Sequence, residues 1–491
     1  MMPPVNPSSA GWRFDNSYVR LPEVCFSRVK PTPVGQPNTV LFNRDLARSL
    51  GLDAEALADE SASGVFSGNV LPAGSEPIAQ AYAGHQFGNF TRLGDGRAIL
   101  LGEQITPAGT RFDIQLKGAG PTLYSRSGDG RAALGPMLRE YVVSEAMHAL
   151  GIPTTRSLAV ASTGEPVFRD RPLPGAVLTR VAASHIRVGT FEYLSALGDH
   201  GALRALVNFT VARHFPEIVD SPNLPLALLA GVLERQASLV VAWLRVGFVH
   251  GVMNTDNMAL SGETIDYGPC AFLDAYDPAT VFSSIDRGGR YAFARQPPIV
   301  AWNLSRLAEA LLPVLDPDPT RSAEQAEGIL ATYPEVFGRH WLTMMRGKLG
   351  LFTEEIEDTA LADDLLQWMQ RHQADYTHTF RKLAPNYPVP TGKSAEPGFT
   401  EWHQRWTDRL ARQPQPLAEA TARRHAHTPA VIPRNRQVEE ALELAVEGRD
   451  LSAVNRLLAA LANPYDEAGK PPELLTPPES CHDGYCTFCG T

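Results

Sequence analysis

The spacing of apolar residues divides the chain into a strand-rich part followed by a helical part. Between Ala81 and Val188, short apolar stretches alternate with glycine turns. Residues 111–117 alternate apolar and polar side chains with a period of two, which predicts a strand. From about Gly201 onward, apolar residues recur at helical spacing. A small region of strands is therefore expected to precede a larger region of helices.

Individual elements are predicted within both parts. Residues 90–93 and 98–101 flank Gly94-Asp95-Gly96, which predicts a hairpin. Residues 136–150 are expected to form a helix, because Pro136 suits a first turn and Gly151-Ile152-Pro153 ends it. The other expected elements are a strand at residues 177–181, helices at 203–215, 226–246 and 303–312, and further helices between 318 and 463.

The same patterns predict the organisation of the chain. Residues 1–75 combine frequent Pro and Gly with weak periodicity, so an N-terminal extension of loops and short helices is expected. Residues 76–188 are expected to form a small strand-rich lobe, and 189–463 a helical lobe with additional C-terminal helices. Residues 247–290 within it are expected to be a loop-and-hairpin region. Residues 464–491 are expected to be a tail that contains cysteines. The expected fold class is α+β.

Composition and charge restrict the partners. Hydrophobic residues make up 44% of the 491 residues, which is enough for a large core. The net charge of −10 argues against a duplex nucleic acid partner. No secretory signal is recognised, and no stretch is expected to cross a membrane, since the best candidate, residues 239–253, contains Arg245 and His250. Five cysteines do not predict a disulfide framework, so a soluble, cytoplasmic protein is expected.

The segment from His250 to Asn257 and the later Asp266-Tyr-Gly268 carry the strongest chemical signal. A long apolar helix precedes the first motif, and residues 258–265 are predicted as two short strands around a turn. This order is typical of the catalytic segment of kinase-like folds, where an Asn and an Asp bind Mg²⁺. Asn257 and Asp266 occupy those two positions, and oxygen ligands suit magnesium.

One position departs from the kinase pattern. A kinase-like loop has its catalytic Asp two residues after the His, and here that residue is Val252, which cannot accept a proton. Either the protein is an inactive scaffold, or another group handles the nucleophile. Asp256 is the nearest spare carboxylate.

Upstream residues supply the other parts of a nucleotide site. Lys117 ends a predicted strand and Glu140 lies on the following helix, as in the Lys–Glu pair that positions phosphates in kinases; Glu145 is an alternative partner. Two glycine turns have the composition that lets backbone N–H groups approach phosphate. These turns are Gly94-Asp95-Gly96-Arg97 and Ser127-Gly128-Asp129-Gly130-Arg131, and Arg97, Arg180 and Arg187 are further candidates for phosphate contacts.

Each part also has an ordinary structural interpretation. A Gly-Asp-Gly sequence is usually a simple turn, a Lys–Glu pair is usually a surface ion pair, and His250 is expected to bond the backbone near the loop. The order of all the parts is much rarer than any one of them. That order favours a kinase-like protein.

Several longer motifs resemble the selenoprotein-O family of protein adenylyltransferases, over most of the chain from about Phe14. They are Tyr82-Ala-Gly-His-Gln-Phe-Gly88, Gln115-Leu-Lys-Gly-Ala-Gly-Pro-Thr122, Tyr124-Ser-Arg-Ser-Gly-Asp-Gly-Arg131, His250-Gly-Val-Met-Asn-Thr-Asp-Asn-Met258 and Asp266-Tyr-Gly-Pro269.

The resemblance implies a bilobal, protein-kinase-like fold that binds ATP in a flipped orientation, with the α-phosphate facing the acceptor. It implies AMP transfer to Ser, Thr or Tyr hydroxyls of other proteins, with Mg²⁺ or Mn²⁺, and UTP as a further substrate in some bacterial members. It further implies that Asp256 is the base, that Asn257 and Asp266 bind the metal, and that Lys117 pairs with Glu140. The nucleotide pocket implied by the family consists of Gly94, Gly96, Arg97, Lys117, Asp129, Gly130, Arg180, Arg187 and Asp266.

The cysteines near the C-terminus leave three interpretations open. Cys486-Thr-Phe-Cys489 has the spacing of redox dithiols and of zinc sites, and Cys481-His482 lies just before it. The family often has a redox-active residue near its C-terminus, and a disulfide from the tail to Cys270 would gate acceptor access. A zinc site and inert thiols are the alternatives.

Two other functions stay open. A conventional phosphotransferase would use the same ATP and metal machinery, but Val252 argues against it. A catalytically inactive pseudokinase scaffold would not need metal ligands, yet Asn257 and Asp266 are both present.

Overall fold

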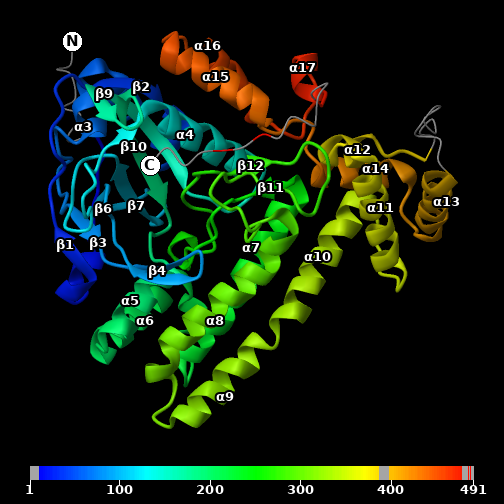
Figure 1. Ribbon diagram of the computed structural model, residues 1–491, viewed down its shortest axis with the longest axis horizontal. Coiled ribbons are helices and arrows are strands. Elements are labelled where there is room, and N and C mark those ends of the chain that lie inside the picture. Colours follow the sequence, from blue (N-terminus) through cyan, green and yellow to red (C-terminus); the bar gives the residue numbers. More distant parts are fainter. Residues whose placement is uncertain (1–9, 386–396, 478–484, 486, 488–491) are drawn as a thin grey trace.

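The computed structural model describes residues 10–385, 397–477, 485 and 487, and its largest sheet is formed by strands between residues 26 and 182 (Figure 1). This sheet has eight strands in the order β1-β3-β6-β7-β10-β9-β2, with β8 paired to β10. Two short two-stranded sheets, β4-β5 and β11-β12, lie apart from it. The strands are β1 Phe26–Arg28, β2 Asn38–Phe42, β3 Ile78–Gln80, β4 Ala83–Gln86, β5 Asn89–Arg92, β6 Ala98–Ile105, β7 Arg111–Lys117, β8 Ala132–Ala133, β9 Arg156–Phe168, β10 Pro172–Ala182, β11 Phe248–Val249 and β12 Ala271–Phe272.

Helices cover both faces of the large sheet and make up most of the rest of the chain. Helix α3 packs on β9 and β10 from one side, and α4 packs on the same strands from the other. The helices are α1 Arg44–Ser49, α2 Ala54–Ala58, α3 Ser63–Ser67, α4 Leu134–Ala149, α5 Val188–Leu197, α6 His200–His214, α7 Leu224–Val246, α8 Gln296–Leu315, α9 Pro319–Leu330, α10 Tyr333–Leu349, α11 Asp358–His372, α12 Tyr376–Lys382, α13 Pro397–Arg412, α14 Leu417–His427, α15 Asn435–Glu447, α16 Ser452–Leu461 and α17 Pro472–Leu475.

Most of the elements expected from apolar spacing are present. The strand at β7 has the predicted bounds, and the expected helices correspond to α4, α6, α7 and α8. Local signals explain the ends of α7: the side chain of Asn223 accepts a hydrogen bond from Leu226 N, and Gly247 ends the helix with a φ of 76°. Helix α5 was not among the expected elements, and the mixed α/β character agrees with the predicted α+β class.

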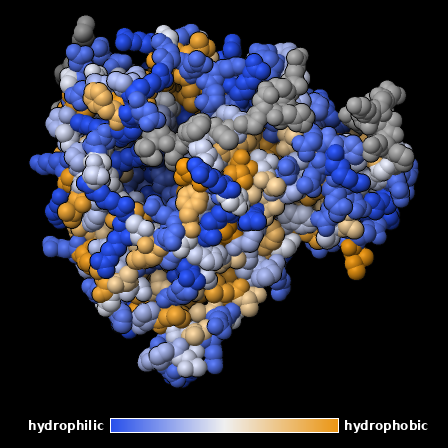
Figure 2. Space-filling view, in the orientation of Figure 1, coloured by the Kyte–Doolittle hydropathy of each residue, from blue (hydrophilic) through white to orange (hydrophobic). Residues whose placement is uncertain are grey.

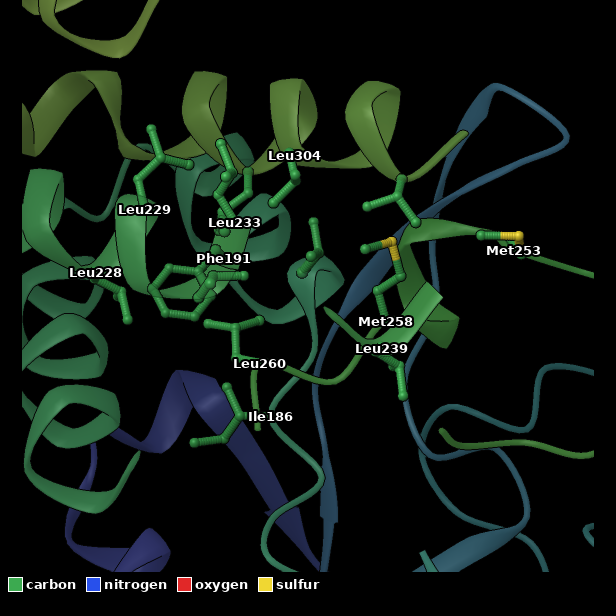
Figure 3. Packing of buried hydrophobic residues seen from close by; sticks show 14 of the residues in the cluster. Ile186, Phe191, Leu228, Leu229, Leu233, Leu239, Met253, Met258, Leu260 and Leu304 are labelled. Atoms are coloured by element: carbon green, nitrogen blue, oxygen red, sulfur yellow. The ribbon is translucent and has the colours of Figure 1, made fainter. Parts of the chain in front are cut away.

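Helix α7 is the centre of the helical core. Its apolar side chains meet those of α5 and α8 and of the loop after β11, as Figure 3 shows for Phe191, Leu233 and Leu304. Met253 and Met258 bring that loop into the same cluster, and Asn303 Nδ2 on α8 donates to the Met253 carbonyl oxygen at 2.9 Å. The loop after β11 is therefore anchored on the apolar core formed by α5, α7 and α8.

The last long helices return to the first part of the chain. Helices α15 and α16 pack against the outer side of α4, so α4 lies between them and the sheet (Figure 1). The shared cluster includes Leu138 and Val142 of α4 together with Leu442 and Leu457. The position of α4 thus depends on residues about 300 positions later in the chain.

Two predicted hairpins are wrong. Residues 90–93 do not pair with 98–101, because β5 pairs with β4, whereas β6 pairs with β3 and β7. The glycine turn between them instead connects two different sheets. Residues 258–260 and 264–265 do not pair with each other either: Ala259 bridges to Arg187 and Thr264 to Thr154. In the first case β5 pairs with the strand just before it rather than the one after it, and in the second case a distant segment is the preferred partner, which local spacing cannot reveal.

The N-terminal segment contributes more than loops and short helices. β1 and β2 occupy the two edges of the eight-stranded sheet, at opposite ends of the strand order. The strands are only three and five residues long, so they fall below the length at which alternation is a clear signal.

One helix in the described part of the chain, α7, is long and apolar enough to cross a membrane, so the expectation that no stretch qualifies was wrong. Half of its most apolar window is buried inside the protein. A central helix of a packed bundle has the same length and composition. On the face drawn in Figure 2, hydrophilic residues predominate and hydrophobic ones are scattered among them.

Candidate nucleotide-binding site

The site begins with three side chains on one face of the large sheet. In the register of β7 and β10, Gln115 lies opposite Arg180, and Lys117 is two residues further along β7, so all three point to the same side. Helix α4 covers this side and brings Glu140 over it. Lys117 Nζ lies 2.8 Å from Glu140 Oε2, and Arg180 Nη2 lies 2.5 Å from Glu140 Oε1. The alternative partner, Glu145, pairs with Arg156 instead.

Asp266 joins this cluster from the loop before β12. Its Oδ1 lies 2.9 Å from Lys117 Nζ and 2.6 Å from Arg180 Nη2, and its Oδ2 lies 2.6 Å from Arg187 Nη1. Burial acts to raise the pKa of Asp266, but Arg180, Lys117 and Arg187 together hold that pKa well below the ordinary value. Three cations therefore surround two carboxylates, which leaves an excess of positive charge for an anionic ligand.

A cavity of about 860 Å³ opens beside this cluster. Such a volume is in the range of nucleotide-sized ligand sites. Every sequence-predicted nucleotide, metal or catalytic residue lies in its wall. These are Gly94, Gly96, Arg97, Lys117, Asp129, Gly130, Arg180, Arg187, Asp256, Asn257 and Asp266.

Two glycines of the turns occupy positions that other residues cannot. Gly94 has a φ of 139°, and a Cβ there would lie 2.3 Å from the ring of Tyr124. Gly130 has a φ of 67°, and a Cβ would lie 2.1 Å from the carbonyl carbon of Gly120. The tight packing of these turns keeps their backbone at the cavity wall.

Asp256 lies on a single 3-10 turn, Thr255–Asn257, and is largely buried. Burial raises the pKa of Asp256 to about 6, although Arg187 acts to lower that pKa. Its Oδ1 is buried and has no hydrogen-bond partner among the described residues. Val252 also lines the cavity, and His250 bonds the Ile265 carbonyl oxygen at 2.8 Å, as its structural interpretation predicted.

Asn257 lines the cavity, and its side-chain amide makes one hydrogen bond within the described residues. Its Nδ2 donates to the Val252 carbonyl oxygen at 2.9 Å, which leaves the amide oxygen free of a donor within the described part of the chain. The described residues contain no group of three or more His, Cys, Asp or Glu side chains arranged for a metal. Asn257 and Asp266 would therefore supply only part of a coordination shell, and phosphates and water would have to complete it.

Asp129 and the predicted redox cysteines lie in different surroundings. Asp129 Oδ2 lies 2.9 Å from Arg169 Nη1, at the exposed edge of the cavity. Cys270 is fully buried, and burial raises the pKa of its thiol to about 11. Cys481, His482, Cys486 and Cys489 lie outside the described residues. Their neighbour Thr487 is described, and its Oγ1 donates to the Pro269 carbonyl oxygen at 2.7 Å.

Asp95 is a cavity residue that sequence reasoning missed as a chemical group. It is 1% exposed, and its Oδ2 accepts a hydrogen bond from Gln80 N at 3.0 Å. Burial raises its pKa to about 6. Its position between Gly94 and Gly96 favoured interpretation as a turn residue, and no local pattern distinguishes a buried Asp from an exposed one there.

Comparison with known proteins gives a consistent result over the whole chain. Residues 10–462 match the family model described as protein adenylyltransferase SelO. The chain is 59% identical over 481 residues to the protein nucleotidyltransferase YdiU of Syntrophotalea carbinolica, covering 98% of both chains. It is 58% identical to the proteins of the same name from Halalkalibacterium halodurans and Brevibacillus brevis, again covering 98% of both chains. With this coverage and identity, the chain belongs to the SelO family of protein adenylyltransferases and is a nucleotidyltransferase enzyme.

Proposed function

We propose that the 860 Å³ cavity binds ATP with a divalent metal and that the enzyme transfers AMP to Ser, Thr or Tyr hydroxyls of other proteins. The observation that carries this proposal is the cluster of Lys117, Arg180 and Arg187 around Glu140 and Asp266 at the cavity wall. In the reaction, the acceptor oxygen bonds to the α-phosphorus and the bond from that phosphorus to the bridging oxygen breaks. Pyrophosphate leaves, and the acceptor proton passes to Asp256.

The cationic cluster suits a departing pyrophosphate. Glu140 holds Lys117 and Arg180 at fixed positions before any ligand arrives, because Glu140 is 2% exposed and bonds both. Burial acts to raise the pKa of Glu140, and Arg180 and Lys117 hold that pKa below its ordinary value, so the carboxylate stays ionised. Charges held in place stabilise a transition state without reorganisation. The nucleotide would then lie with its outer phosphates against this cluster, in the flipped orientation.

Asn257 and Asp266 would hold Mg²⁺ or Mn²⁺. Both provide oxygen atoms at the cavity wall, and the donor set matches the preference of these cations. A bound ion would neutralise charge on the phosphates. Phosphate oxygens would also draw Lys117, Arg180 and Arg187 away from Asp266, which frees its carboxylate for the ion.

Asp256 is the group that we assign as the general base. It lines the cavity, whereas the residue at the usual kinase position is Val252. A base whose pKa is raised toward the working pH removes a proton more effectively, and such a base contributes about 10²- to 10⁴-fold to a rate. A displaced base agrees with a reaction at the α-phosphorus rather than the γ-phosphorus.

The fold that we propose is bilobal and protein-kinase-like, with residues 76–188 as the small lobe and 189–463 as the helical lobe. The order of a Lys on β7, a Glu on α4, the long helix α7 and the Asp266 loop supports this assignment. Residues 1–75 and 464–491 are then extensions of the kinase-like core, and the first of them adds the edge strands β1 and β2 to the sheet of the small lobe.

Substrates and surroundings are assigned by the same reasoning. The acceptors are proteins, ATP is the nucleotide donor, and UTP is a second donor. We assign no nucleic acid partner, given the net charge of −10, no membrane partner, and a cytoplasmic location. For Cys270, Cys486 and Cys489 we propose a redox role, with a zinc site and inert thiols as the alternatives. The contact in its favour is the hydrogen bond from Thr487 Oγ1 to the carbonyl oxygen of Pro269, the residue before Cys270.

An isotope experiment tests the activity against its two alternatives. The enzyme is incubated with a generic acceptor protein and Mg²⁺, and with ATP labelled at the α- or the γ-phosphate. Label from the α-phosphate alone supports AMP transfer. Label from the γ-phosphate alone would show a conventional phosphotransferase, and no label from either would show an inactive pseudokinase scaffold.

A further inference from the structure

The short hairpin β4–β5 contacts the loop that carries Asp256. His85 N donates to Thr255 Oγ1 at 2.7 Å, and Phe87 N donates to Asn254 Oδ1 at 3.0 Å. The hairpin turns at Phe87 and Gly88, whose φ values of 51° and 89° are both positive, as a tight two-residue turn requires. Two backbone groups of one hairpin thus hold the two side chains that precede Asp256.

The buried carboxylate of Glu192 bonds both Thr255 and His85, so these three residues form a closed ring of hydrogen bonds. Glu192 on α5 accepts a hydrogen bond from Thr255 Oγ1 through Oε2 at 2.5 Å, and its Oε1 lies 2.5 Å from His85 Nδ1. The side chain of Glu192 is only 4% exposed. The ring of His85 is held edge-on by Phe90 and by Trp302 of α8, each with ring centroids 5.4 Å away. A polar network of this kind fixes its members strongly when every member is satisfied.

The hairpin also lies directly against Asp256. A Cβ on Gly84 would be 2.1 Å from Asp256 Oδ1, and a Cβ on Gly189 would be 1.8 Å from the Ala83 carbonyl oxygen. No side chain fits between hairpin, loop and α5. On the other side, Met253 and Met258 anchor the same loop in the apolar core (Figure 3).

The side chain of Asp256 packs against Gly84 and makes few polar contacts among the described residues. Its Oδ1 has no hydrogen-bond partner in the described part of the chain, so its position depends on the backbone of the 3-10 turn. Thr255 connects that turn to the hydrogen-bonded network of His85 and Glu192. A displacement of about 1 Å at a reacting group costs about 10²-fold in rate.

We propose that His85 and Glu192 are positioning residues, which set the place of the Asp256 carboxylate by fixing the side chain of Thr255. The proposal deepens the proposed function and rests on the assignment of Asp256 as the base. It predicts an effect on the transfer step and little effect on nucleotide binding, because neither residue lines the cavity.

The test measures kcat and KM for ATP in the full-length enzyme carrying His85→Ala or Glu192→Ala. We expect kcat to fall about 10- to 100-fold while KM for ATP stays within about two-fold. His85→Asn, which keeps a polar nitrogen near the Nδ1 position, should recover much of the loss. His340→Ala is the matched control, because His340 pairs with Glu234 at 2.7 Å in an exposed His–Glu pair far from the cavity. Wild-type kcat in His85→Ala and Glu192→Ala, or an effect confined to KM, would overturn the proposal.

A second comparison separates this proposal from the assignment of Asp256. In an Asp256→Ala background, His85→Ala should cause no further loss of residual activity, because its effect passes through Asp256. A further loss of similar size would overturn the positioning role. Should Asp256→Ala alone remain active, the base assignment fails whatever His85 does. Should the alanine variants not fold, Glu192→Gln, which preserves size but loses one of the two acceptor oxygens that bond His85 and Thr255, decides the same question through a fall in kcat.

Discussion

Asp256 differs from Glu140 and Asp266, its neighbours in the site, because it makes no ion pair within the described residues. Glu140 and Asp266 each lie within 3 Å of two or more cationic side chains, which keep them ionised. Asp256 is buried without such a partner, and this burial raises its pKa to about 6. Neighbouring carboxylates with opposite pKa shifts suit different tasks, one to hold cations and one to accept a proton.

Replacing Asp256 tests the role of the unpaired carboxylate. Asp256→Ala should lower kcat by about 10²- to 10⁴-fold, because the acceptor proton loses its recipient. Val252→Ala, at the position of the kinase base, should change kcat by less than about five-fold, since it removes only apolar contacts. Steady-state transfer of α-labelled AMP measures both. Equal losses in the two variants would contradict the assignment.

Glu263 provides a pH-dependent test of stability at a single residue. Burial raises its pKa to about 7, while hydrogen bonds from Ser261 and Ala183 act to lower that pKa. The unfolded chain ionises from the ordinary value upward, so the folded state loses stability as the pH rises from about 4.5 to about 7. Glu263→Gln removes this loss. The free energy of unfolding of Glu263→Gln, relative to that of wild type, should therefore increase by up to about 3 kcal/mol between pH 5 and pH 8. The melting temperature of the variant relative to wild type should rise accordingly.

The control for this measurement is Glu443→Gln on the exposed surface of α15. It should alter the melting temperature little at either pH. If the difference in melting temperature between Glu263→Gln and wild type is the same at both pH values, burial does not raise the pKa of Glu263.

At the scale of elements, α4 links the site to the C-terminal helices. It presents Glu140 to Lys117 and Arg180 on one side and packs against α15 and α16 on the other. The loop with Asp256 is held in a comparable way, between the β4–β5 hairpin and the core beneath α7 and α8. Elements distant in the sequence thus determine the positions of both Glu140 and Asp256.

Two leucines on α15 test how much this packing contributes. Leu442 is 7% exposed and belongs to the cluster shared with α4, whereas Leu444 is 48% exposed. Leu442→Ala should lower the free energy of unfolding by about 2–5 kcal/mol through the cavity that it leaves. Leu444→Ala should change it by no more than about 0.5 kcal/mol. Chemical denaturation measures both, and equal effects would contradict the packing of α15 on α4.

At the scale of the whole molecule, the cavity collects residues from separate parts of the chain. Its wall combines the glycine turns, the end of β7, β10 and the loop around Asp266, over a span from Tyr82 to Ile285. A ligand that contacts all of these at once favours the folded state as a unit.

Nucleotide should therefore stabilise the enzyme against heat. ATP with Mg²⁺ at about 100 times the dissociation constant should add about 2.7 kcal/mol to the free energy of unfolding, which appears as a rise in melting temperature. In Asp266→Asn this rise should disappear, whatever the melting temperature of the ligand-free variant. Asp45→Asn, at an exposed position, should keep the full rise. An undiminished rise in Asp266→Asn would exclude that residue from nucleotide binding.

Much of the architecture follows from local order along the chain. The period-two alternation of residues 111–117 and the apolar spacing of α7 were sufficient for those elements, because each pattern reports burial of one face. The motifs around Lys117, Asn257 and Asp266 were also sufficient to name the residues that line one cavity. The order of these chemical groups along the chain indicates that they share a site, even though the sequence contains no distances.

Pairing and burial depend on contacts that no local pattern contains. The bridges of Ala259 and Thr264 and the edge positions of β1 and β2 were settled by segments far away in the chain. The same is true of Asp95, of the ring formed by His85, Glu192 and Thr255, and of the choice of Glu140 over Glu145. The sequence gives only the residue type of an Asp or a His, which is the same whether the side chain is buried or exposed. Only packing between distant segments determines its neighbours and its charge.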